Sequence, residues 1–158
     1  MIQKITPFLW FDDNAEEAVN YYTSIFKNSK VTNVARYGDH PHGEKGKVMT
    51  MEFQLEGLNF TALNGGPVYK FSQAISFLVS CETQAEVDHL WEKLSAGGEV
   101  QQCGWLVDKF GVTWQIVPAL LGKLMSGKDP VKANRVMQAM LLMAKLDMAK
   151  LQHAYDHE

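Results

Sequence analysis

The sequence is poor in cysteine, has no long apolar run and carries little excess charge of either sign. Cys81 and Cys103 are far apart and form no Cys-x-x-Cys pair, so we expect two reduced, partly buried thiols. No segment approaches the roughly 18 consecutive apolar residues that a membrane-spanning helix needs. The residues Met1–Pro7 lack the apolar core of a signal peptide, which favours a cytoplasmic location. The net charge of -3 and the pI near 5.9 argue against nucleic acid as the main partner.

A chain of 158 residues is long enough to bury a core without disulfides or a structural metal. The apolar periodicity of its first half predicts a strand, a helix and three further strands. Asn14, with Glu17 three residues later, resembles a capping box at the start of that helix. A loop dense in glycine, proline and histidine covers residues 38–46. The predicted elements are the strand Ile5–Phe11, the helix Ala15–Phe26, and the strands Lys30–Tyr37, Val48–Leu55 and Leu58–Leu63.

The second half repeats this order of elements. Thr83, with Glu86 three residues later, predicts a capped helix start. The repeat gives an α+β fold of two βαβββ modules, at about 2–66 and 74–118, within one domain of residues 1–118. The second module is predicted to contain the strand Ala74–Cys81, the helix Ala85–Ser95, the strand Glu99–Gln102 and a hairpin between Gly104 and Pro118.

Residues 119–158 read as a helical extension. A short helix is predicted at Ala119–Met125, and a proline suited to a helix start follows at Pro130. One long amphipathic helix is then predicted from Val131 to about Tyr155. Its methionine-rich face suits packing against the sheet or a second subunit better than it suits a variable ligand. The extension also allows a different function, in which the protein acts by binding another protein through these helices.

The hairpin from Gly104 to Pro118 is the most informative segment. Asp108 and Gly111 supply turn chemistry between two runs that favour extended backbone. Alternation along the second strand places Thr113, Gln115 and Val117 on one face and Trp114 and Ile116 on the other. Gln115 is therefore a polar group among strand-forming apolar residues, as in the wall of a cavity.

Five segments carry a family resemblance, namely Ile5–Phe11, Ala15–Ala18, Ser76–Val79, Trp91–Leu94 and Gly104–Pro118. Together they resemble the PhnB-like branch of the glyoxalase/bleomycin-resistance superfamily, whose members are also called vicinal oxygen chelate proteins. This resemblance implies that the paired modules form a curved mixed sheet or half-barrel cleft, and that the protein is a homodimer. The branch often carries the label of a 3-demethylubiquinone methyltransferase.

In metal-dependent members of that superfamily, each module supplies two inward ligands, typically His or Glu. The resemblance places these positions at Thr6, at Ala62 or Asn64, at Ser76 and at Gln115. These side chains offer no charge and only weak oxygen ligands, so we expect neither a metal nor a cofactor. The sequence also lacks the glycine-rich strand-to-helix turn that usually holds S-adenosylmethionine, because Gly65-Gly66 is followed by a proline.

The favoured interpretation is a protein that binds a small molecule in a cleft without a superfamily-type metal. An apolar wall with a few convergent hydrogen-bonding groups is typical of small-molecule sites. The alternative is a metal-dependent lyase, isomerase or dioxygenase, and a methyltransferase is less favoured than either. No catalytic residue, nucleic-acid partner or membrane contact is predicted. The candidate cleft residues are Thr6, Trp10, Asn64, Ser76, Trp105 and Gln115.

Overall fold

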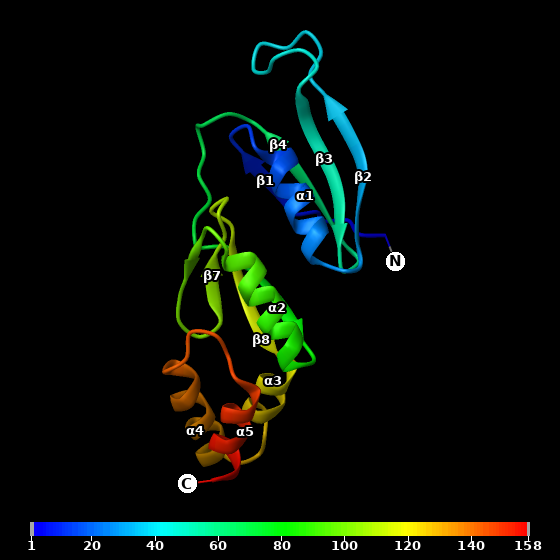
Figure 1. The fold of residues 1–158 in the computed structure, drawn as a ribbon. Helices are drawn as coiled ribbons and strands as arrows, with labels where there is room; N and C mark the ends of the chain where they lie inside the picture. The colour runs from blue at the N-terminus through cyan, green and yellow to red at the C-terminus, as the bar shows by residue number, and fades with distance from the viewer. Residues whose placement is uncertain (1, 158) are drawn as a thin grey trace. The chain divides into compact units, whose positions relative to one another are not determined.

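The computed structural model describes residues 2–157. The chain divides into two compact units, Met1–Phe71 and Ser72–Glu158 (Figure 1). The first unit contains a four-stranded sheet in the order β1-β4-β3-β2. The strand β1 pairs in parallel with β4, and the other pairs are antiparallel. The elements are β1 (Phe8–Phe11), α1 (Ala15–Ile25), β2 (Ser29–Arg36), β3 (Val48–Leu55) and β4 (Leu58–Asn64).

The second unit repeats this topology. Its sheet has the order β5-β8-β7-β6, again with a parallel β5–β8 pair and antiparallel neighbours. Three helices follow the sheet and belong to the same compact unit. The elements are β5 (Phe77–Cys81), α2 (Gln84–Ser95), β6 (Glu99–Val100), β7 (Trp105–Val107), β8 (Thr113–Pro118), α3 (Ala119–Met125), α4 (Pro130–Leu141) and α5 (Met148–Asp156).

The predicted α+β fold with two βαβββ modules is thus confirmed as two open mixed sheets. In each unit the alternation of side chains buries one face of the sheet with its helix. Tyr22 of α1 and Phe53 of β3 are buried in the first unit, as are Leu94 of α2 and Ile116 of β8 in the second. The opposite face of each sheet is not covered by the helix of its own module.

The two predicted helix starts have different outcomes. Thr83 caps α2 as predicted, because its hydroxyl oxygen accepts a hydrogen bond from the amide of Glu86 at 3.2 Å. The carboxylate of Glu86 in turn accepts from the amide of Glu82. Asn14 occupies the N-cap position of α1 as predicted, but the predicted capping bond is wrong, since its side chain makes no capping hydrogen bond. The side chain of Asn64 takes over that role by accepting from the amide of Ala15 at 2.8 Å.

The long helix predicted from Val131 to Tyr155 is also wrong, because the chain leaves the helix after Leu141 and re-enters it at Met148. Residues 142–147, called the α4–α5 linker below, lie against α2 and the turn between β6 and β7. The carbonyl groups of Met143 and Ala144 accept from the amides of Cys103 and Gly104, both at 2.8 Å. A continuous helix would have used these carbonyls internally.

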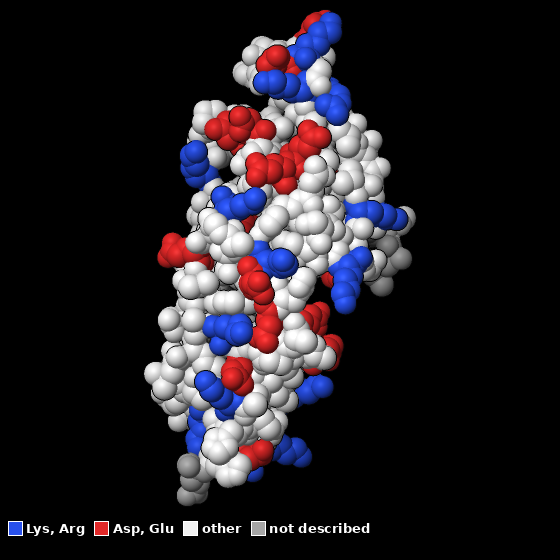
Figure 2. Space-filling view, viewed as in Figure 1, with Lys and Arg blue, Asp and Glu red and all other residues white. Residues whose placement is uncertain are grey.

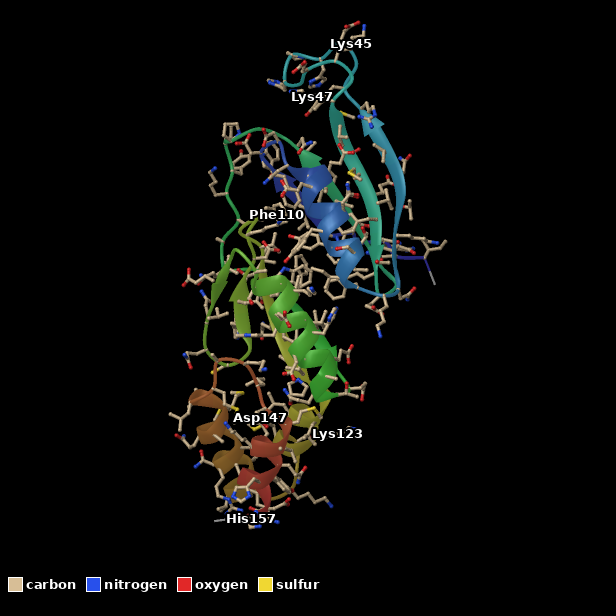
Figure 3. The ribbon with its side chains drawn as sticks, in the orientation of Figure 1. Lys45, Lys47, Phe110, Lys123, Asp147 and His157 are labelled. Atoms are coloured by element: carbon tan, nitrogen blue, oxygen red, sulfur yellow. The ribbon has the colours of Figure 1, made fainter. Side chains whose placement is uncertain are left out.

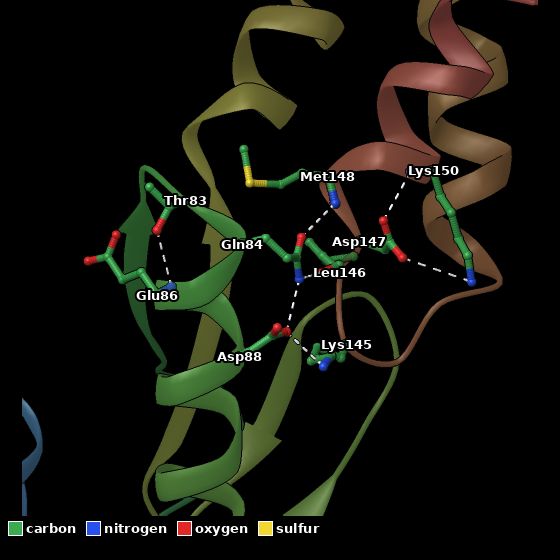
Figure 4. Close-up of polar contacts among 9 residues, drawn as sticks. All are labelled: Thr83, Gln84, Glu86, Asp88, Lys145, Leu146, Asp147, Met148 and Lys150. Atoms are coloured by element: carbon green, nitrogen blue, oxygen red, sulfur yellow. Dashed lines mark hydrogen bonds and ion pairs between the residues drawn. The ribbon is translucent and has the colours of Figure 1, made fainter.

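The linker is also held by side chains of α2 (Figure 4). Gln84 donates to the carbonyl of Leu146 at 3.1 Å and accepts from the amide of Met148 at 2.8 Å. Lys145 pairs with Asp88 at 2.7 Å, and the ammonium is the main cause of a lowered pKa at that carboxyl group. Asp147, labelled in Figure 3 between α4 and α5, caps α5 by accepting from the amide of Lys150.

Leu146 fills a small core that the three C-terminal helices make with the end of β8. This core consists of Leu124, Val136, Leu146 and Leu151, with partly buried apolar side chains that include Val117 around it. Within residues 2–157, no helix is both long and apolar enough to cross a membrane. On the face shown in Figure 2, acidic and basic side chains are interspersed.

Candidate functional site

The open face of the second sheet gathers three of the predicted cleft residues. On β8, Gln115 lies between Trp105 of β7 and Leu78 of β5 in the strand register. Residues directly opposite one another in neighbouring strands project to the same face. This face, called the Gln115 face below, carries Leu78, Ser80, Trp105, Val107, Thr113, Gln115 and Val117.

Ser76 joins this group through a side-chain hydrogen bond. The amide nitrogen of Gln115 donates to the hydroxyl oxygen of Ser76 at 2.8 Å. Ser76 stands one residue before β5, so the β5–β8 register brings it level with Thr113. Gln115 and Trp105 are half-buried, and Leu78 is 58% exposed. The structure therefore brings three of the six candidate cleft residues together, namely Ser76, Trp105 and Gln115.

Thr113 is a member of this face that the prediction of cleft residues missed. Its side chain is 1% exposed, and its hydroxyl oxygen has no hydrogen-bond partner among the residues that the structure describes. Buried hydroxyl groups normally find a partner, so an unpaired one needs an explanation. The alternation of β8 was a usable signal, because it already placed Thr113 on the same face as Gln115.

The remaining three predicted residues lie in the first unit. Thr6 is exposed and precedes β1. Trp10 is half-buried on β1, where its indole N–H donates to the carbonyl of Gly66 at 2.9 Å. A Cβ atom on Gly65 would clash with the Trp10 ring, so the tight glycine turn after β4 allows the ring to pack there.

Asn64 performs a structural task on the helix-covered face of the first sheet. It shares the side of β4 with Phe60 and Ala62, both buried. Its side-chain oxygen accepts from Ala15, and its side-chain nitrogen donates to the carbonyl of Val48 at 3.1 Å. Both ends of this amide are therefore engaged in holding α1 and β3 together.

Asp108 sits in the turn before β8 and is 3% exposed. One carboxylate oxygen accepts from the amides of Phe110 and Val112, and the other accepts from the indole of Trp114 at 2.9 Å. The residue is thus the turn-forming group that the sequence indicated, with an added link to Trp114. A carboxylate held by three donors is poorly suited to take a proton from a substrate.

The two cysteines are free thiols, and Cys81 is fully buried. Burial raises the pKa of the Cys81 thiol from 9.0 to about 12, with a smaller contribution from the charges of Glu86 and Glu82. Cys81 is therefore protonated at neutral pH and does not act as a nucleophile. Cys103 is half-buried in a left-handed conformation with φ of 60°, and its sulfur contacts the carbonyl oxygen of Met140.

The residues at the implied metal positions do not fit a divalent ion. Thr6, Ser76 and Gln115 are uncharged, and the Gln115 amide is already bonded to Ser76. Asn64 is engaged with Ala15 and Val48. Across residues 2–157, no group of three or more His, Cys, Asp or Glu side chains is arranged to hold a metal ion. His40 and His42 contact each other in the loop between β2 and β3, where Lys45 and Lys47 also lie (Figure 3).

The comparison with known families assigns the fold. The family model described as 3-demethylubiquinone-9 3-methyltransferase matches residues 3–117. The chain belongs to this PhnB-like family. The matched span ends within β8, so the helices α3, α4 and α5 of this PhnB-like chain lie beyond it.

Solved structures of similar proteins share this fold. The PhnB protein from Bacillus cereus is 37% identical, with a TM-score of 0.69 over 74% of this PhnB-like chain and 100% of its own. A protein from Pseudomonas aeruginosa is 23% identical, with a TM-score of 0.63 over 74% and 98% of the two chains. A glyoxylase/bleomycin resistance protein/dioxygenase domain from Frankia shares the fold at 15% identity and a TM-score of 0.50, over 75% and 93%. No curated protein matches the chain.

Proposed function

We propose that this glyoxalase/bleomycin-resistance-type protein binds a small molecule at the Gln115 face, without a metal site of the superfamily type. The observation that carries the proposal is the 2.8 Å hydrogen bond between Gln115 and Ser76. Two positions implied as metal ligands are here neutral and bonded to each other, beside the half-buried ring of Trp105. An apolar wall with a few fixed polar groups supports binding of an organic ligand.

Thr6 and Trp10 belong to the first unit and stay candidate ligand contacts of that unit by itself, apart from the Gln115 face. Asn64 is the weakest of the six candidate cleft residues, because its side-chain amide is hydrogen-bonded to the start of α1 and to β3. No proton-transfer step is assigned, since Gln115 and Ser76 do not act as bases at neutral pH. Whether a bound molecule also reacts is therefore a separate question from whether it binds.

A thermal-shift screen of organic fragments tests the proposal. A ligand at a hundred times its Kd stabilises a protein by about 2.7 kcal/mol, which gives a readily measured shift in Tm. We expect Trp105→Ala to abolish the shift produced by each true ligand. Trp91→Ala is the matched control, because Trp91 is a half-buried tryptophan on α2. Shifts that survive Trp105→Ala, or that Trp91→Ala removes equally, would place binding elsewhere.

Metal-dependent lyase, isomerase or dioxygenase chemistry is the competing function. Elemental analysis of protein purified without chelators separates the two, and we expect less than a tenth of an equivalent of nickel, iron, manganese or zinc. About one equivalent of a divalent metal, lost in a Gln115→Ala variant, would favour the competing function. A metal retained in that variant would point to other ligands.

Methyl transfer, which the family description names, is not part of the proposal. Gly65 and Gly66 follow β4 and lead into Pro67, with no helix start after them. A phosphate- or nucleoside-binding turn of the usual methyltransferase kind instead joins a strand directly to a helix. The close approach of Gly65 to the Trp10 ring gives the glycine pair a packing role.

We also propose a homodimer in the cytoplasm. Exposed apolar side chains on the open sides of both sheets, including Phe8 and Leu78, support association. The two free thiols support a reducing compartment. Light scattering after gel filtration tests the oligomeric state, and a mass near 17.8 kDa across micromolar concentrations would refute the dimer.

A further inference from the structure

The polar groups of the Gln115 face identify the class of ligand, and this step rests on the proposed function. Ser76 uses one end of the Gln115 amide, and the other end has no partner among residues 2–157. The amide carries an acceptor and a donor end, so one hydrogen-bonding group is free whichever way it is turned. The hydroxyl of Thr113 is a second unpaired group within the described chain.

A third unpaired group comes from Trp105. No hydrogen bond of its indole N–H is made within the described chain, in contrast to Trp10 and Trp114, whose indoles donate to Gly66 and Asp108. Its ring stands opposite Gln115 in the β7–β8 register. A half-buried indole offers a flat apolar surface and one donor at its edge. The face therefore combines an aromatic platform with neutral hydrogen-bonding groups.

The strands that form the Gln115 face carry few charged side chains on that face. The β-ladder places a single charged residue of the described strands on the same face, Glu99, opposite Val107. Glu99 is exposed on the two-residue edge strand β6, where water screens it. Asp108 is engaged by three donors and serves the turn. An ion placed against Thr113 would lose its hydration without gaining a counter-charge, which is strongly unfavourable.

We infer that the Gln115 face takes an uncharged aromatic molecule that carries a hydroxyl group. The ring lies against Trp105 and the apolar side chains of Leu78 and Val117. The hydroxyl bonds to the free end of the Gln115 amide, and it reaches the buried Thr113 hydroxyl once a side chain that covers that oxygen moves aside. Because Thr113 is buried whereas Leu78 is exposed, the hydroxyl of the ligand lies toward Thr113 and the opposite edge of the ring lies toward Leu78.

Four probes that differ only in one substituent test this inference on the full chain. They are 4-methylphenol, 4-methylanisole, 4-methylbenzoate and 4-methylbenzylamine, of which the last two are charged at pH 7. Titrations followed by amide NMR give the Kd and the residues affected. We expect 4-methylphenol to shift the amides of Trp105, Thr113 and Gln115. Its Kd should be about fivefold lower than that of the ether, and at least about tenfold lower than those of the ions.

Two substitutions distinguish the effect of the Thr113 hydroxyl group from the effect of the side chain's size and shape. Thr113→Val removes the unpaired hydroxyl, so we expect a higher Tm together with an about fivefold weaker affinity for 4-methylphenol. The preference for the phenol over 4-methylanisole should then shrink to the part that the bond to Gln115 provides. Thr113→Ser keeps the hydroxyl and should retain the preference for the phenol. A gain in stability with a loss of binding is an outcome that a merely structural hydroxyl does not produce.

Each contrary result has a distinct meaning. Equal or tighter binding of either ion at the same amides overturns the ligand class and leaves the proposed function standing. A lower Tm for Thr113→Val with unchanged phenol affinity also overturns it, because the hydroxyl is then satisfied inside the folded protein. No shift of these amides with any probe overturns the ligand class as well, and the fragment screen with Trp105→Ala then decides the proposed function separately.

Discussion

At the scale of single residues, the buried carboxylate of Asp108 accepts three hydrogen bonds within the turn before β8. Asp108→Asn replaces one carboxylate oxygen by an NH2 group, which donates and cannot accept. The asparagine side chain therefore cannot accept from all three donors that bond to Asp108. We expect a loss of about 1–3 kcal/mol in the free energy of unfolding, measured by urea titration. Asp39→Asn is the matched control, since Asp39 forms an exposed pair with Lys45 and should change stability by less than about 0.5 kcal/mol. Equal losses would show that the turn does not depend on the carboxylate.

The two thiols should also differ at this scale. With a pKa of about 12, the Cys81 thiol is ionised in about one molecule in ten thousand at pH 8. We expect iodoacetamide at pH 8 to alkylate Cys103 in the folded protein and both cysteines in urea, as read by peptide mass spectrometry. Rapid alkylation of Cys81 in the folded protein would contradict its burial.

The raised pKa of Cys81 also sets a direction for the pH dependence of stability. Below about pH 9, the thiol is protonated in both the folded and the unfolded states, and its contribution is fully present. Between about pH 9 and pH 12, the unfolded chain loses this proton first, so the free energy of unfolding falls as the pH rises. Comparing the alkaline unfolding curves of the wild type and Cys81→Ala isolates this slope.

At the scale of elements, the α4–α5 linker depends on one glutamine. Gln84→Ala removes the bonds to Leu146 and Met148, and we expect a loss of about 1–3 kcal/mol. The amides of Cys103 and Gly104, which donate to the linker, should exchange hydrogen faster. Gln152→Ala is the control, because Gln152 bonds Asp156 along the surface of α5 and should cost less than about 0.5 kcal/mol. Unchanged exchange at Gly104 would mean that the linker is held without Gln84.

The same linker shows what the sequence could and could not predict. Alternation in residues 113–118 predicted the two faces of β8 correctly, because a strand places each side chain by its own parity. Residues 142–146 contain neither glycine nor proline, so local propensity favoured a continuous helix. The break is caused instead by partners about 40 and 60 residues away, at Cys103, Gly104 and Gln84. Asp147 before Met148 was a local capping signal that went unused.

The role of Asn64 was hidden for a related reason. Its helix-capping partner, Ala15, lies 49 residues earlier in the chain, and the nearer Asn14 has the residue type of a cap. The prediction placed an implied metal position at Ala62 or Asn64 by strand register alone, whereas both residues share the helix-covered side of β4. The hydrogen bonds of Asn64 to Ala15 and Val48, rather than its residue type, determine that its amide is not available to a ligand.

At the scale of the whole molecule, each unit has its own sheet, its own helix and its own buried side chains. The C-terminal helices belong to the second unit alone, through the core around Leu146 and the bonds to Cys103 and Gly104. The turn that receives these bonds leads directly into Trp105. The helical extension is therefore part of what holds one wall of the proposed ligand site in place, although it lies beyond the residues that the family model matches.

Truncation of residues 129–158 tests this arrangement. The truncated chain loses Val136, Leu146 and Leu151, three fully buried side chains, and the loss should cost about 5 kcal/mol or more. We expect hydrogen exchange to show lost protection in β6, β7 and β8, while β3 and β4 of the first unit stay protected. Leu142→Ser is the control, because Leu142 is 87% exposed and should change nothing. If β3 and β4 lose protection together with β8, the two units unfold as one cooperative body. If β8 stays protected, the extension is not a structural support of the Gln115 face.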